Sequence, residues 1–494
     1  MPHEQRGNEP HNVRPDQRYD VPKTMTFSTE DTIVAIATPP GQGGVGIVRL
    51  SGSQAWGYGQ RLFQRVRDGS PIRSHVLAFG HAVDPATHAV LDEGMIAYMR
   101  GPHSYTGEDS VEINAHGAPL VLRRIVEAAL ALGARMAEPG EMTLRAFLHR
   151  RIDLAQAEAV ADLIAANSDA AIRQALGQLA GKLSEQIAGA RVAVLRALAP
   201  IEASMDFPDD EVPPPQIADL LIAIDAADAI VSALLAGAER GRVTREGVRC
   251  VIVGRPNVGK SSLLNALLRA DRAIVTPIAG TTRDTIEETA IVGGIACHLV
   301  DTAGITASND PIERIGVERS RTALQAAEIT LLVLDRSVAL TDEDRAVITE
   351  VAKQGARGLL IVLNKSDLPA TLDSAMVSDA MQAADIATSS LPIITVSGVT
   401  STGIDALETA IAERALGGPV TESAGLVARA RHRDALRLAH DALLAAHETL
   451  ATGLPLDLAA EDLRDALYAF GTITGETITE DLLTTIFQEF CIGK

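Results

Sequence analysis

The chain has 494 residues, which predicts roughly three domains at about 150 residues each. Its residues are 46% apolar, 22% charged and only 3% aromatic, so we expect a globular protein with an aliphatic, alanine-rich core. The net charge of −20 excludes binding to nucleic acid through net charge alone. Three scattered cysteines exclude a disulfide framework, and no uninterrupted apolar run reaches the about 18 residues of a membrane span. We therefore expect a cytoplasmic protein with no membrane partner.

The N-terminal part combines a polar tail with a mixed helix and strand pattern. Residues 1–27 are predicted to be a disordered tail, because their charges are balanced and apolar side chains are almost absent. Residues 28–146 are predicted to form an α+β domain. Its expected strands are 33–36, 47–50 and 111–114, its expected helix is 120–132, and a loop rich in glycine and proline is expected over 39–46.

Two helical segments, 147–246 and 416–494, flank a different pattern. Ile172, Leu176, Leu179 and Leu183 recur every three or four residues, which is the period of one helix face. We expect helix over 153–200, 217–237, 416–450 and 459–490, with Pro208 and the prolines at 213–215 as breaks. The simplest interpretation is one helical domain into which another domain is inserted.

The inserted region, 247–415, alternates short apolar strands with helices. Strands are expected at 251–253, 298–300, 331–334, 360–363 and 393–396. Continuous apolar strands alternating with helices indicate a mostly parallel sheet that is covered on both faces. The predicted fold class is therefore multidomain α+β and α/β, with a doubly wound sheet inserted into the helical domain.

Residues 254–261, Gly-Arg-Pro-Asn-Val-Gly-Lys-Ser, fit the phosphate-loop pattern G-x-x-x-x-G-K-S. They follow the strand at 251–253 and precede a helix that opens at Ser262, which is the context the pattern requires. The glycines let backbone N–H groups surround phosphates, Lys260 supplies a positive charge, and the Ser261 hydroxyl can bind magnesium. The alternative is an ordinary glycine-rich turn.

Three further segments follow predicted strands in the order found in GTPases. Asp301 to Gly304 can hold magnesium through water and contact the γ-phosphate. The Asp367 carboxylate, in Asn364 to Asp367, can accept two hydrogen bonds from guanine that adenine does not offer. Ser397 can contact the base carbonyl. Residues 248–412 thus resemble the TRAFAC-class P-loop GTPases. The residues predicted to contact GTP are Asn257, Val258, Gly259, Lys260, Ser261, Ser262, Thr276, Pro277, Ile278, Ala279, Gly280, Thr281, Thr282, Asp301, Thr302, Ala303, Gly304, Asn364, Lys365, Asp367 and Ser397.

Hydrolysis requires a positioned water and a positive charge at the transition state. Ile305 occupies the position at which Ras-like GTPases carry a glutamine, and its side chain supplies neither. We therefore expect a monovalent cation, held by the Asn257 amide oxygen and by backbone carbonyls of Thr276, Ile278 and Thr281. The alternative is that Asn257 only caps the loop. Within the segment 280–284, Thr282 is the expected magnesium ligand.

The whole chain from residue 32 onward resembles the MnmE (TrmE) family of tRNA modification GTPases. The segments that carry this resemblance are 38–41 (Thr-Pro-Pro-Gly), 43–49, 104–109 (Ser-Tyr-Thr-Gly-Glu-Asp), 116–117, 139–141, 145–148 (Arg-Ala-Phe-Leu), 153–159, the GTPase segments and the ending 491–494 (Cys-Ile-Gly-Lys). The resemblance implies an N-terminal domain that dimerises and binds a folate, and a GTPase domain activated by potassium-dependent pairing. With the FAD-dependent partner MnmG (GidA), this family adds an aminomethyl or carboxymethylaminomethyl group to C5 of the wobble uridine in certain tRNAs.

The resemblance also implies cofactors and residue roles. The cofactors are GTP, magnesium, potassium and 5-formyl- or 5,10-methylene-tetrahydrofolate, and the partners are a second copy of the chain, MnmG and tRNA. The matching positions are Asn257, Thr276, Ile278 and Thr281 for potassium, Ser261 and Thr282 for magnesium, Glu313 for orienting the attacking water, Arg283 and Asp284 for hydrolysis, Arg49, Glu112, Arg151 and Lys494 for folate, and Cys491 for the modification.

Several of these assignments have simpler alternatives. Glu313 can be a solvated helix charge, Arg49 and Glu112 can be strand-end charges, and Arg151 departs from the lysine found in many members. Other functions also fit parts of the pattern. One is a GTP-dependent ribosome-assembly factor, although no basic G-x-x-G loop follows residue 412. Another is a folate-dependent one-carbon transferase that the GTPase domain only regulates.

Three sequence features are not functional motifs on this interpretation. The glycines of 41–46 precede a strand rather than a helix, which argues against a dinucleotide site. The last four residues have the spacing of a prenylation signal, but Gly493 and Lys494 are poor choices for it. Cys250 and Cys297 lie in or beside strands and are predicted to be buried packing residues.

Overall fold

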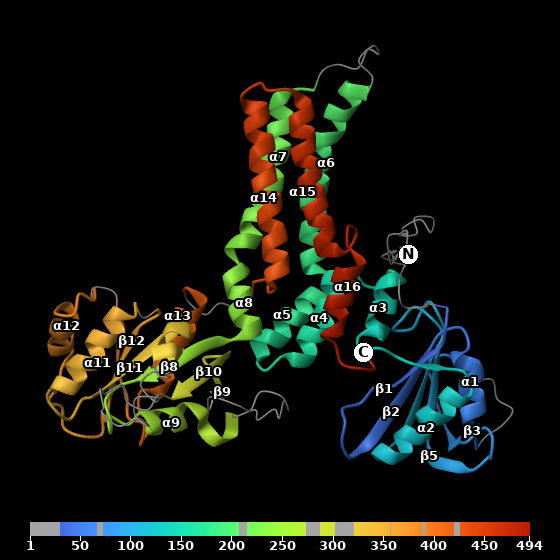
Figure 1. Ribbon diagram of the computed structural model, residues 1–494, viewed down its shortest axis with the longest axis horizontal. Helices are drawn as coiled ribbons and strands as arrows, with labels where there is room; N and C mark the ends of the chain where they lie inside the picture. The colour runs from blue at the N-terminus through green and yellow to red at the C-terminus, as the bar shows by residue number, and fades with distance from the viewer. Residues whose placement is uncertain are drawn as a thin grey trace, which may run out of the picture. The chain divides into compact units, whose positions relative to one another are not determined.

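The computed structural model describes residues 30–66, 73–206, 215–272, 287–301, 321–355, 357–387, 391–418 and 425–494. They fold as two compact units, the first within Met1–Ala157 and Thr474–Lys494 and the second within Glu158–Ile473 (Figure 1). The C-terminal segment therefore folds with the N-terminal part of the chain. The predicted tail, residues 1–27, lies outside the described residues.

A seven-stranded sheet forms the centre of the first unit. Its order is β3-β4-β5-β6-β2-β1-β7, and neighbouring strands are antiparallel except for the parallel pair β1 and β7. The predicted strands at 33–36, 47–50 and 111–114 are confirmed as β1, β2 and β6. The strands are β1 (Ile33–Ile36), β2 (Gly43–Ser51), β3 (Phe63–Arg65), β4 (Leu77–Val83), β5 (Val90–Met99), β6 (Ser110–Gly117) and β7 (Arg135–Met136).

The glycine-rich segment before residue 47 is partly strand, so the predicted loop over 39–46 is wrong from Gly43 onward. Strand β2 begins at Gly43 and contains an irregularity between Gly43 and Gly46. A Cβ atom on Gly46 would lie 2.5 Å from Leu122 of helix α2. Glycine is needed there because the strand and the helix approach each other closely, which composition alone does not indicate.

The described residues of the first unit also form the helices α1 (Ala55–Leu62), α2 (Pro119–Ala131), α3 (Glu141–Leu148) and α16 (Glu480–Gln488). Helix α2 confirms the prediction for 120–132. Proline lies in its first turn, where no N–H is needed, and Gly133 follows it with φ of 106°. Its buried residues Leu122, Ile125 and Ala129 pack in one core with the sheet residues Val48 and Ile113.

The helices of the second unit are α4 (Leu154–Ala165), α5 (Asp169–Leu179), α6 (Lys182–Asp206), α7 (Ile217–Ala236), α8 (Ala238–Glu246), α14 (Ala430–Ala451) and α15 (Leu456–Thr474); α4 starts four residues before this unit. Three of the predicted helices are wrong in extent. The run 153–200 contains three helices, because Ser168 caps α5 by accepting a hydrogen bond from the Ala171 N–H and Gly181 separates α5 from α6. In the run 416–450, Leu416 ends α13 (Ile404–Leu416), the described residues 425–429 are not helical and α14 begins at Ala430, while 459–490 is divided between α15 and α16.

Helix α7 packs against α6 and α14 in this bundle (Figure 1). The helical stretch Ile217–Glu246 has the length and the mean hydropathy, 2.0, of a membrane span. Its carboxylates at Asp228 and Asp225 lie 2.5 and 3.5 Å from His440 and His447 of α14. In this structure one face of α7, including Ile224 and Val231, is buried in the bundle, while 28% of its most apolar window is buried and Ile222 is exposed.

A six-stranded sheet forms the other part of the second unit, in the order β13-β12-β11-β8-β10-β9. All neighbouring strands are parallel except β9 and β10, and this bears out the predicted doubly wound sheet. The strands are β8 (Val248–Val253), β9 (Glu287–Val292), β10 (Ile295–Asp301), β11 (Ile329–Asp335), β12 (Leu360–Asn364) and β13 (Ile393–Thr395).

Alternate residues of these strands enter two separate cores, one on each face of the sheet. The first core contains the sheet residues Cys250, Ile252, Leu331 and Val333 together with residues of α9 (Lys260–Arg272) and α13 (Ile404–Leu416). The second contains the intervening residues with α11 (Asp342–Lys353) and α12 (Ser374–Gln382). Cys250 and Cys297 are fully buried in the first core, which confirms their predicted packing role.

Candidate functional site

The phosphate loop joins β8 to α9, at the C-terminal end of the central strand of the sheet. Asn257 and Gly259 have φ of 63° and 96°, the left-handed conformation that asparagine and glycine tolerate best. A Cβ atom on Gly254 would lie 2.5 Å from the Val333 carbonyl oxygen, so only glycine fits against β11. The loop is thus folded as a cradle that ends at the N-terminus of α9, where backbone N–H groups favour an anion.

Lys260 lies across this loop in the structure. Its Nζ donates hydrogen bonds to the carbonyl oxygens of Gly254 (2.9 Å) and Arg255 (3.0 Å). The side chain is only 9% exposed, so its positive charge is held inside the cradle. Ser261 occupies the first turn of α9, and the Asn257 side chain is exposed at the tip of the loop. These positions fit a phosphate group with a magnesium ion beside it.

Asn364 ties the phosphate loop to the two segments predicted to contact the base. Its Nδ2 donates to the Val258 carbonyl oxygen (2.9 Å), and its Oδ1 accepts from the Gly398 N–H (3.0 Å). Because the side chain is only 2% exposed, its hydrogen bonds hold the phosphate loop and the segment at Gly398 together inside the protein. Because β12 and β13 are parallel, their C-terminal ends meet at the same edge as the phosphate loop.

Asp367 and Ser397 lie together at this edge, as the sequence predicts. The Ser397 hydroxyl donates to Asp367 Oδ1 (2.6 Å) and accepts from the Thr400 N–H (3.1 Å). Ser397 is fully buried while Asp367 is exposed, so the buried hydroxyl orients a carboxylate that remains accessible. A carboxylate held in this way can accept a pair of N–H donors from one edge of a base.

Asp335, at the end of β11, belongs to this edge although sequence analysis did not select it. Its carboxylate accepts from the Lys365 ammonium (2.6 Å) and from the Ser337 hydroxyl (2.6 Å). Burial alone would raise the pKa of Asp335, but the hydrogen bonds from Lys365 and Ser337 outweigh it and lower the pKa. The pair fixes Lys365, whose φ is 65°, beside the base position. The available signal was an acidic residue at the end of a buried strand.

Much of the predicted catalytic machinery lies outside the described residues. This applies to Thr276, Pro277, Ile278, Ala279, Gly280, Thr281, Thr282, Arg283, Asp284, Thr302, Ala303, Gly304 and Glu313. Asp301 ends β10 opposite Ile252 of β8, at the same edge of the sheet as the phosphate loop. Among the described residues, no group of three or more His, Cys, Asp or Glu side chains forms a metal site.

A second candidate site lies on the sheet of the first unit, where Arg49 of β2 faces Glu112 of β6. Arg49 Nε and Nη2 lie 2.8 and 2.7 Å from Glu112 Oε1, and both side chains are mostly buried. The Arg49 guanidinium also lies over the Tyr105 ring, 5.6 Å from its centre. Burial raises the pKa of Tyr105, whose hydroxyl shares a hydrogen bond with Thr143 (2.8 Å). The Arg49 guanidinium therefore lies next to both the Glu112 carboxylate and the face of the Tyr105 ring.

The C-terminal residues lie against the same sheet. Ile492 forms a β-bridge with Pro139, and a side chain on Gly493 would collide with the Ile36 carbonyl group. Ile36 pairs with Val48 in β2, next to Arg49, so the C-terminal peptide approaches the second candidate site. Cys491 is exposed, which leaves its thiol accessible.

The two remaining predicted folate contacts are less constrained. Lys494 is partly exposed at the end of this peptide, and its backbone N–H donates to the Cys491 carbonyl oxygen (3.3 Å). Arg151 is exposed just after α3, and its backbone N–H donates to the Ala146 carbonyl oxygen (2.9 Å). The structure therefore brings Arg49 and Glu112 into contact and leaves these two cations accessible.

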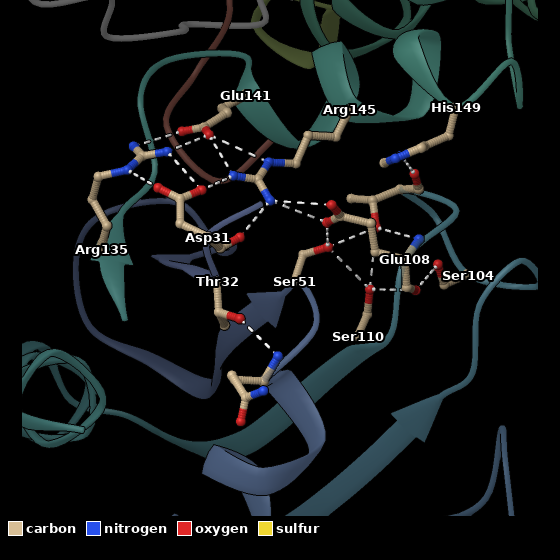
Figure 2. Close-up of polar contacts among 12 residues, drawn as sticks. Asp31, Thr32, Ser51, Ser104, Glu108, Ser110, Arg135, Glu141, Arg145 and His149 are labelled. Atoms are coloured by element: carbon tan, nitrogen blue, oxygen red, sulfur yellow. Dashed lines mark hydrogen bonds and ion pairs between the residues drawn. The ribbon is translucent and has the colours of Figure 1, made fainter. Parts of the chain in front are cut away.

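A buried ion cluster supports the loop that carries Tyr105 (Figure 2). Arg145 of α3 is 1% exposed and donates to Asp31 Oδ1 (2.5 Å), Glu141 Oε1 (3.0 Å) and Glu108 Oε1 (3.2 Å). Arg135 donates to Asp31 and Glu141 at 2.6 Å each. For Arg145, burial opposes the charge, but the surrounding carboxylates outweigh it and raise the pKa.

Glu108 connects this cluster to the strands. It accepts a hydrogen bond from the Ser51 hydroxyl (2.7 Å), and Ser51 shares another with Thr106 (2.6 Å). His149 Nδ1 donates to the Thr106 carbonyl oxygen (2.8 Å). Glu108 thus ties the segment 104–109, which includes Tyr105, to Ser51 of β2 and Arg145 of α3; Figure 2 shows Glu108 between these two side chains. Sequence analysis noted segments containing Glu108 and Arg145 but did not assign this role.

Two family models match consecutive parts of the chain. A family model described as the MnmE helical domain matches residues 154–491, and one described as the GTP-binding protein TrmE N-terminus matches residues 32–151. The tRNA modification GTPase MnmE of Chloroflexus aurantiacus is 49% identical over 466 residues, which cover 94% of this chain and 100% of that protein. The protein of the same name from Roseiflexus sp. is 47% identical over 467 residues, covering 94% of this chain and 99% of the relative.

Solved structures match part of the chain. The G domain of the Thermotoga maritima FeoB iron transporter is 23% identical, covers 34% of this chain and 98% of its own, and gives a TM-score of 0.27. Aquifex aeolicus Era bound to GDP and aluminium fluoride is 24% identical, covers 40% of this chain and 67% of its own, and gives 0.28. From the matches to both family models and to full-length relatives, the chain belongs to the MnmE (TrmE) family of tRNA modification GTPases.

Proposed function

We propose that the chain is a potassium-stimulated GTPase that drives modification of the wobble uridine in certain tRNAs. The product carries an aminomethyl or carboxymethylaminomethyl group at C5, and the protein acts as a cytoplasmic homodimer with a flavin-dependent partner of the MnmG (GidA) type. One observation carries this proposal: Asn364 joins the phosphate loop to Asp367 and Ser397 at one sheet edge, in a chain that matches its family over 94% of its length.

The proposal assigns a task to each part of the chain. Residues 28–146 dimerise and bind folate, and residues 147–246 and 416–494 are assigned to the helical domain, although Thr474–Lys494 fold with the first unit. Residues 247–415 bind and hydrolyse GTP. This division is supported by the parallel sheet between α8 and α13 and by the separate antiparallel sheet of the first unit.

GTP binding follows from groups already positioned at the sheet edge. The Lys260 ammonium exchanges its contacts with the Gly254 and Arg255 carbonyls for oxygens of the β- and γ-phosphates. Asp367, oriented by Ser397, accepts hydrogen bonds from N1 and N2 of guanine. Magnesium held by Ser261, Thr282 and, through water, Asp301 would neutralise phosphate charge.

Hydrolysis of GTP by water yields GDP and phosphate, and it needs charge compensation that Ile305 cannot give. A potassium ion held by Asn257 and the backbone of Thr276, Ile278 and Thr281 would add positive charge beside the phosphates. Glu313 orients the attacking water, and Arg283 and Asp284 respond to the state of the nucleotide. Asn257 already has the left-handed backbone of a loop tip.

The site at Arg49 and Glu112 suits a tetrahydrofolate. Glu112 can bind the N–H groups of a pterin edge, Tyr105 offers a ring face, and Arg151 and Lys494 can pair with glutamate carboxylates. The folate, in its 5-formyl or 5,10-methylene form, would supply the one-carbon unit. Cys491 lies on the peptide that reaches this sheet, which supports a role for its thiol in the modification.

The rate of GTP hydrolysis in potassium and in sodium, at equal ionic strength, tests the hydrolytic part of the proposal. We expect the rate to be at least about tenfold higher in potassium, because sodium is too small for the same carbonyl cage. Equal rates would overturn the cation assignment. Nucleoside analysis of tRNA from a deletion strain tests the biological part, since only a wobble-uridine enzyme restores the C5 group when the gene is returned. An assembly factor or a folate transferase of other substrates leaves that nucleoside unchanged.

Replacing Glu313 by alanine tests the water-orienting role. We expect GTP affinity to stay within about twofold, while turnover falls about 100-fold or more, as is typical for loss of a group that acts in proton transfer or water orientation. Fluorescent-nucleotide binding and single-turnover hydrolysis measure the two effects separately. Normal turnover in potassium would remove Glu313 from the mechanism.

A further inference from the structure

Two chain crossings connect the helical part of the second unit to its parallel sheet. The outgoing crossing is α8, which ends at Glu246 just before β8, and the returning crossing is the segment 425–429 before α14. A side chain on Gly241 of α8 would collide with the Val427 carbonyl group, and one on Gly425 would collide with the Gly237 carbonyl group. The two crossings therefore lie directly against each other.

Side chains from two other helices each hold both crossings at once. The Gln174 amide on α5 donates to the carbonyl oxygens of Gly241 (3.0 Å) and Gly425 (2.6 Å). The Asp162 carboxylate on α4 accepts from Arg245 of α8 (2.8 Å) and from Arg429 of the returning segment (2.8 Å). Gln174 and Asp162 are almost completely buried, so these bonds are shielded from water.

The opposite side of α8 is bound to the sheet. Val243 is buried in the same core as Cys250 and Val292 of the sheet strands. The Arg242 guanidinium donates to the Glu328 carboxylate, which also accepts from the Arg249 N–H of β8 (3.1 Å). Helix α8 is thus fixed on one side by the sheet and on the other by Gln174 and Asp162.

Two open pockets flank α8 in the described part of the chain. A cavity of about 730 Å³ lies on its sheet side, lined in part by Arg240, Arg242 and Arg414. A smaller cavity of about 130 Å³ lies on its helical side, lined in part by Asp162 and Gln174. Both pockets are open to solvent, and between them α8 is held by the polar contacts of Gln174, Asp162 and Arg242.

We propose that α8 is the lever that carries nucleotide-dependent movement of the sheet into the helical part, and that Gln174 and Asp162 are the positioning residues that receive it. This inference rests on the proposed function. A shift of Glu328 moves Arg242 and hence α8, and the two bridging side chains make both crossings move together. Because Asp162 lies on α4, which begins soon after Arg151 in the chain, the displacement enters the segment that leads to the first unit.

Full-length variants test the lever. Gln174→Leu removes both amide donors at similar volume, Asp162→Asn removes the charge that holds two arginines, and Arg242→Ala cuts the link on the sheet side. Gln186→Leu, at an exposed position of α6, is the matched control. We expect GTP hydrolysis within about twofold of wild type in all four, while the three lever variants yield at least about tenfold fewer modified uridines per GTP hydrolysed.

A double variant distinguishes transmission of movement through α8 from a purely structural role of these contacts. If α8 transmits movement, Arg242→Ala with Asp162→Asn is no worse than either change alone, because the path is already interrupted. Defects that multiply, or an unchanged number of uridines per GTP, would overturn the inference. A fall in both hydrolysis and modification, accompanied by a lower melting temperature, would also overturn the inference, because the contacts of Gln174, Asp162 and Arg242 would then serve only folding.

Hydrogen exchange of the full chain provides a test that does not depend on tRNA modification. Wild type is expected to change amide protection in α4 and α5 between GDP and a non-hydrolysable GTP analogue, and Arg242→Ala and Gln174→Leu are expected to lose that response while retaining nucleotide binding. An identical response in the variants would refute the lever. If wild type shows the response but leaves the wobble uridine unmodified, the proposed function fails and the lever stands.

Discussion

The two candidate sites are built in different ways. The nucleotide edge is the edge of the parallel sheet that carries the phosphate loop, Asp367 and Ser397. There, short contiguous segments follow parallel strands, and each segment is positioned by the strand before it. The site at Arg49 and Glu112 instead combines residues from two strands, a loop and α3, and the C-terminal peptide lies against the neighbouring strand β1. The first site needs only the regular geometry of a parallel sheet, whereas the second needs the buried cluster around Arg145 to hold its loop. A change in one region should therefore leave the other intact, and the predictions below test that independence.

The largest effect is expected from Asp367→Asn at the nucleotide edge. The amide cannot accept both guanine N–H groups, and hydrogen bonds to a charged group contribute about 1.5–3 kcal/mol each. Affinity for GTP should fall about 10²–10⁴-fold, and xanthine nucleotide should be tolerated better. Titration with fluorescent GTP and XTP measures both, and Asp385→Asn, at an exposed position, is the control. GTP affinity equal to that of wild type would contradict the base assignment.

Arg145→Met should have the next largest effect, confined to the first unit. It removes the cation that Asp31, Glu108 and Glu141 share and leaves only Arg135 to pair with Asp31 and Glu141, and removal of one partner from a buried ion pair costs about 3–5 kcal/mol. Trp56 is the only tryptophan and packs on Tyr98, with 4.5 Å between ring centres. Its fluorescence in urea therefore reports the unfolding of this unit within a multidomain chain.

The exposed residue Arg124 of α2 provides the control for this experiment. Arg124→Met should change the unfolding free energy by less than about 0.5 kcal/mol. GTP affinity should be unchanged in both variants, since the nucleotide edge is built independently. A loss of GTP binding in Arg145→Met would show that the two regions are not independent.

The same contrast explains how much the sequence can reveal. The central strands of both sheets, α2 and the meeting of Asp367 with Ser397 were predictable, because apolar periodicity and the ends of parallel strands set them locally. The contact between Asp31 and Arg145 joins residues 114 positions apart, and no local pattern encodes it. Gly43–Gly46 was assigned to a loop because composition does not reveal the helix packed against Gly46. The break before Ala430 and the hydrogen bonds of Gln174 likewise depend on contacts between segments that lie far apart in the sequence.

Ser397→Ala tests whether the nucleotide edge needs its own internal support. On the proposed function the hydroxyl orients the Asp367 carboxylate, so its loss removes one supporting hydrogen bond to that group rather than a base contact. We expect a cost of about 0.5–1.5 kcal/mol, or about two- to tenfold weaker GTP binding. Ser374→Ala, at an exposed position of α12, should have no effect. A loss as large as that of Asp367→Asn would mean that Ser397 itself contacts the base.

The smallest effect concerns the pH dependence of the first unit. Burial alone would raise the pKa of Asp31, but hydrogen bonds from Arg135 and Arg145 outweigh it and lower the pKa. A carboxyl group with a lowered pKa stabilises the folded state fully above its unfolded pKa of about 3.9, and this contribution is lost as the pH falls through the folded value. The Trp56-reported free energy of unfolding should therefore decrease between about pH 5 and pH 3.

Asp31→Asn should make that decrease shallower by about 1 kcal/mol or less, since the side chain is 28% exposed and water screens part of its interaction. Glu127→Gln, at an exposed position of α2, should leave the slope as in wild type. A slope unchanged by Asp31→Asn would assign the acid sensitivity of this unit to other carboxylates. GTP affinity at neutral pH should be the same in both variants, because the ion cluster supports the loop at Tyr105 and contributes nothing to the sheet edge that holds the phosphates.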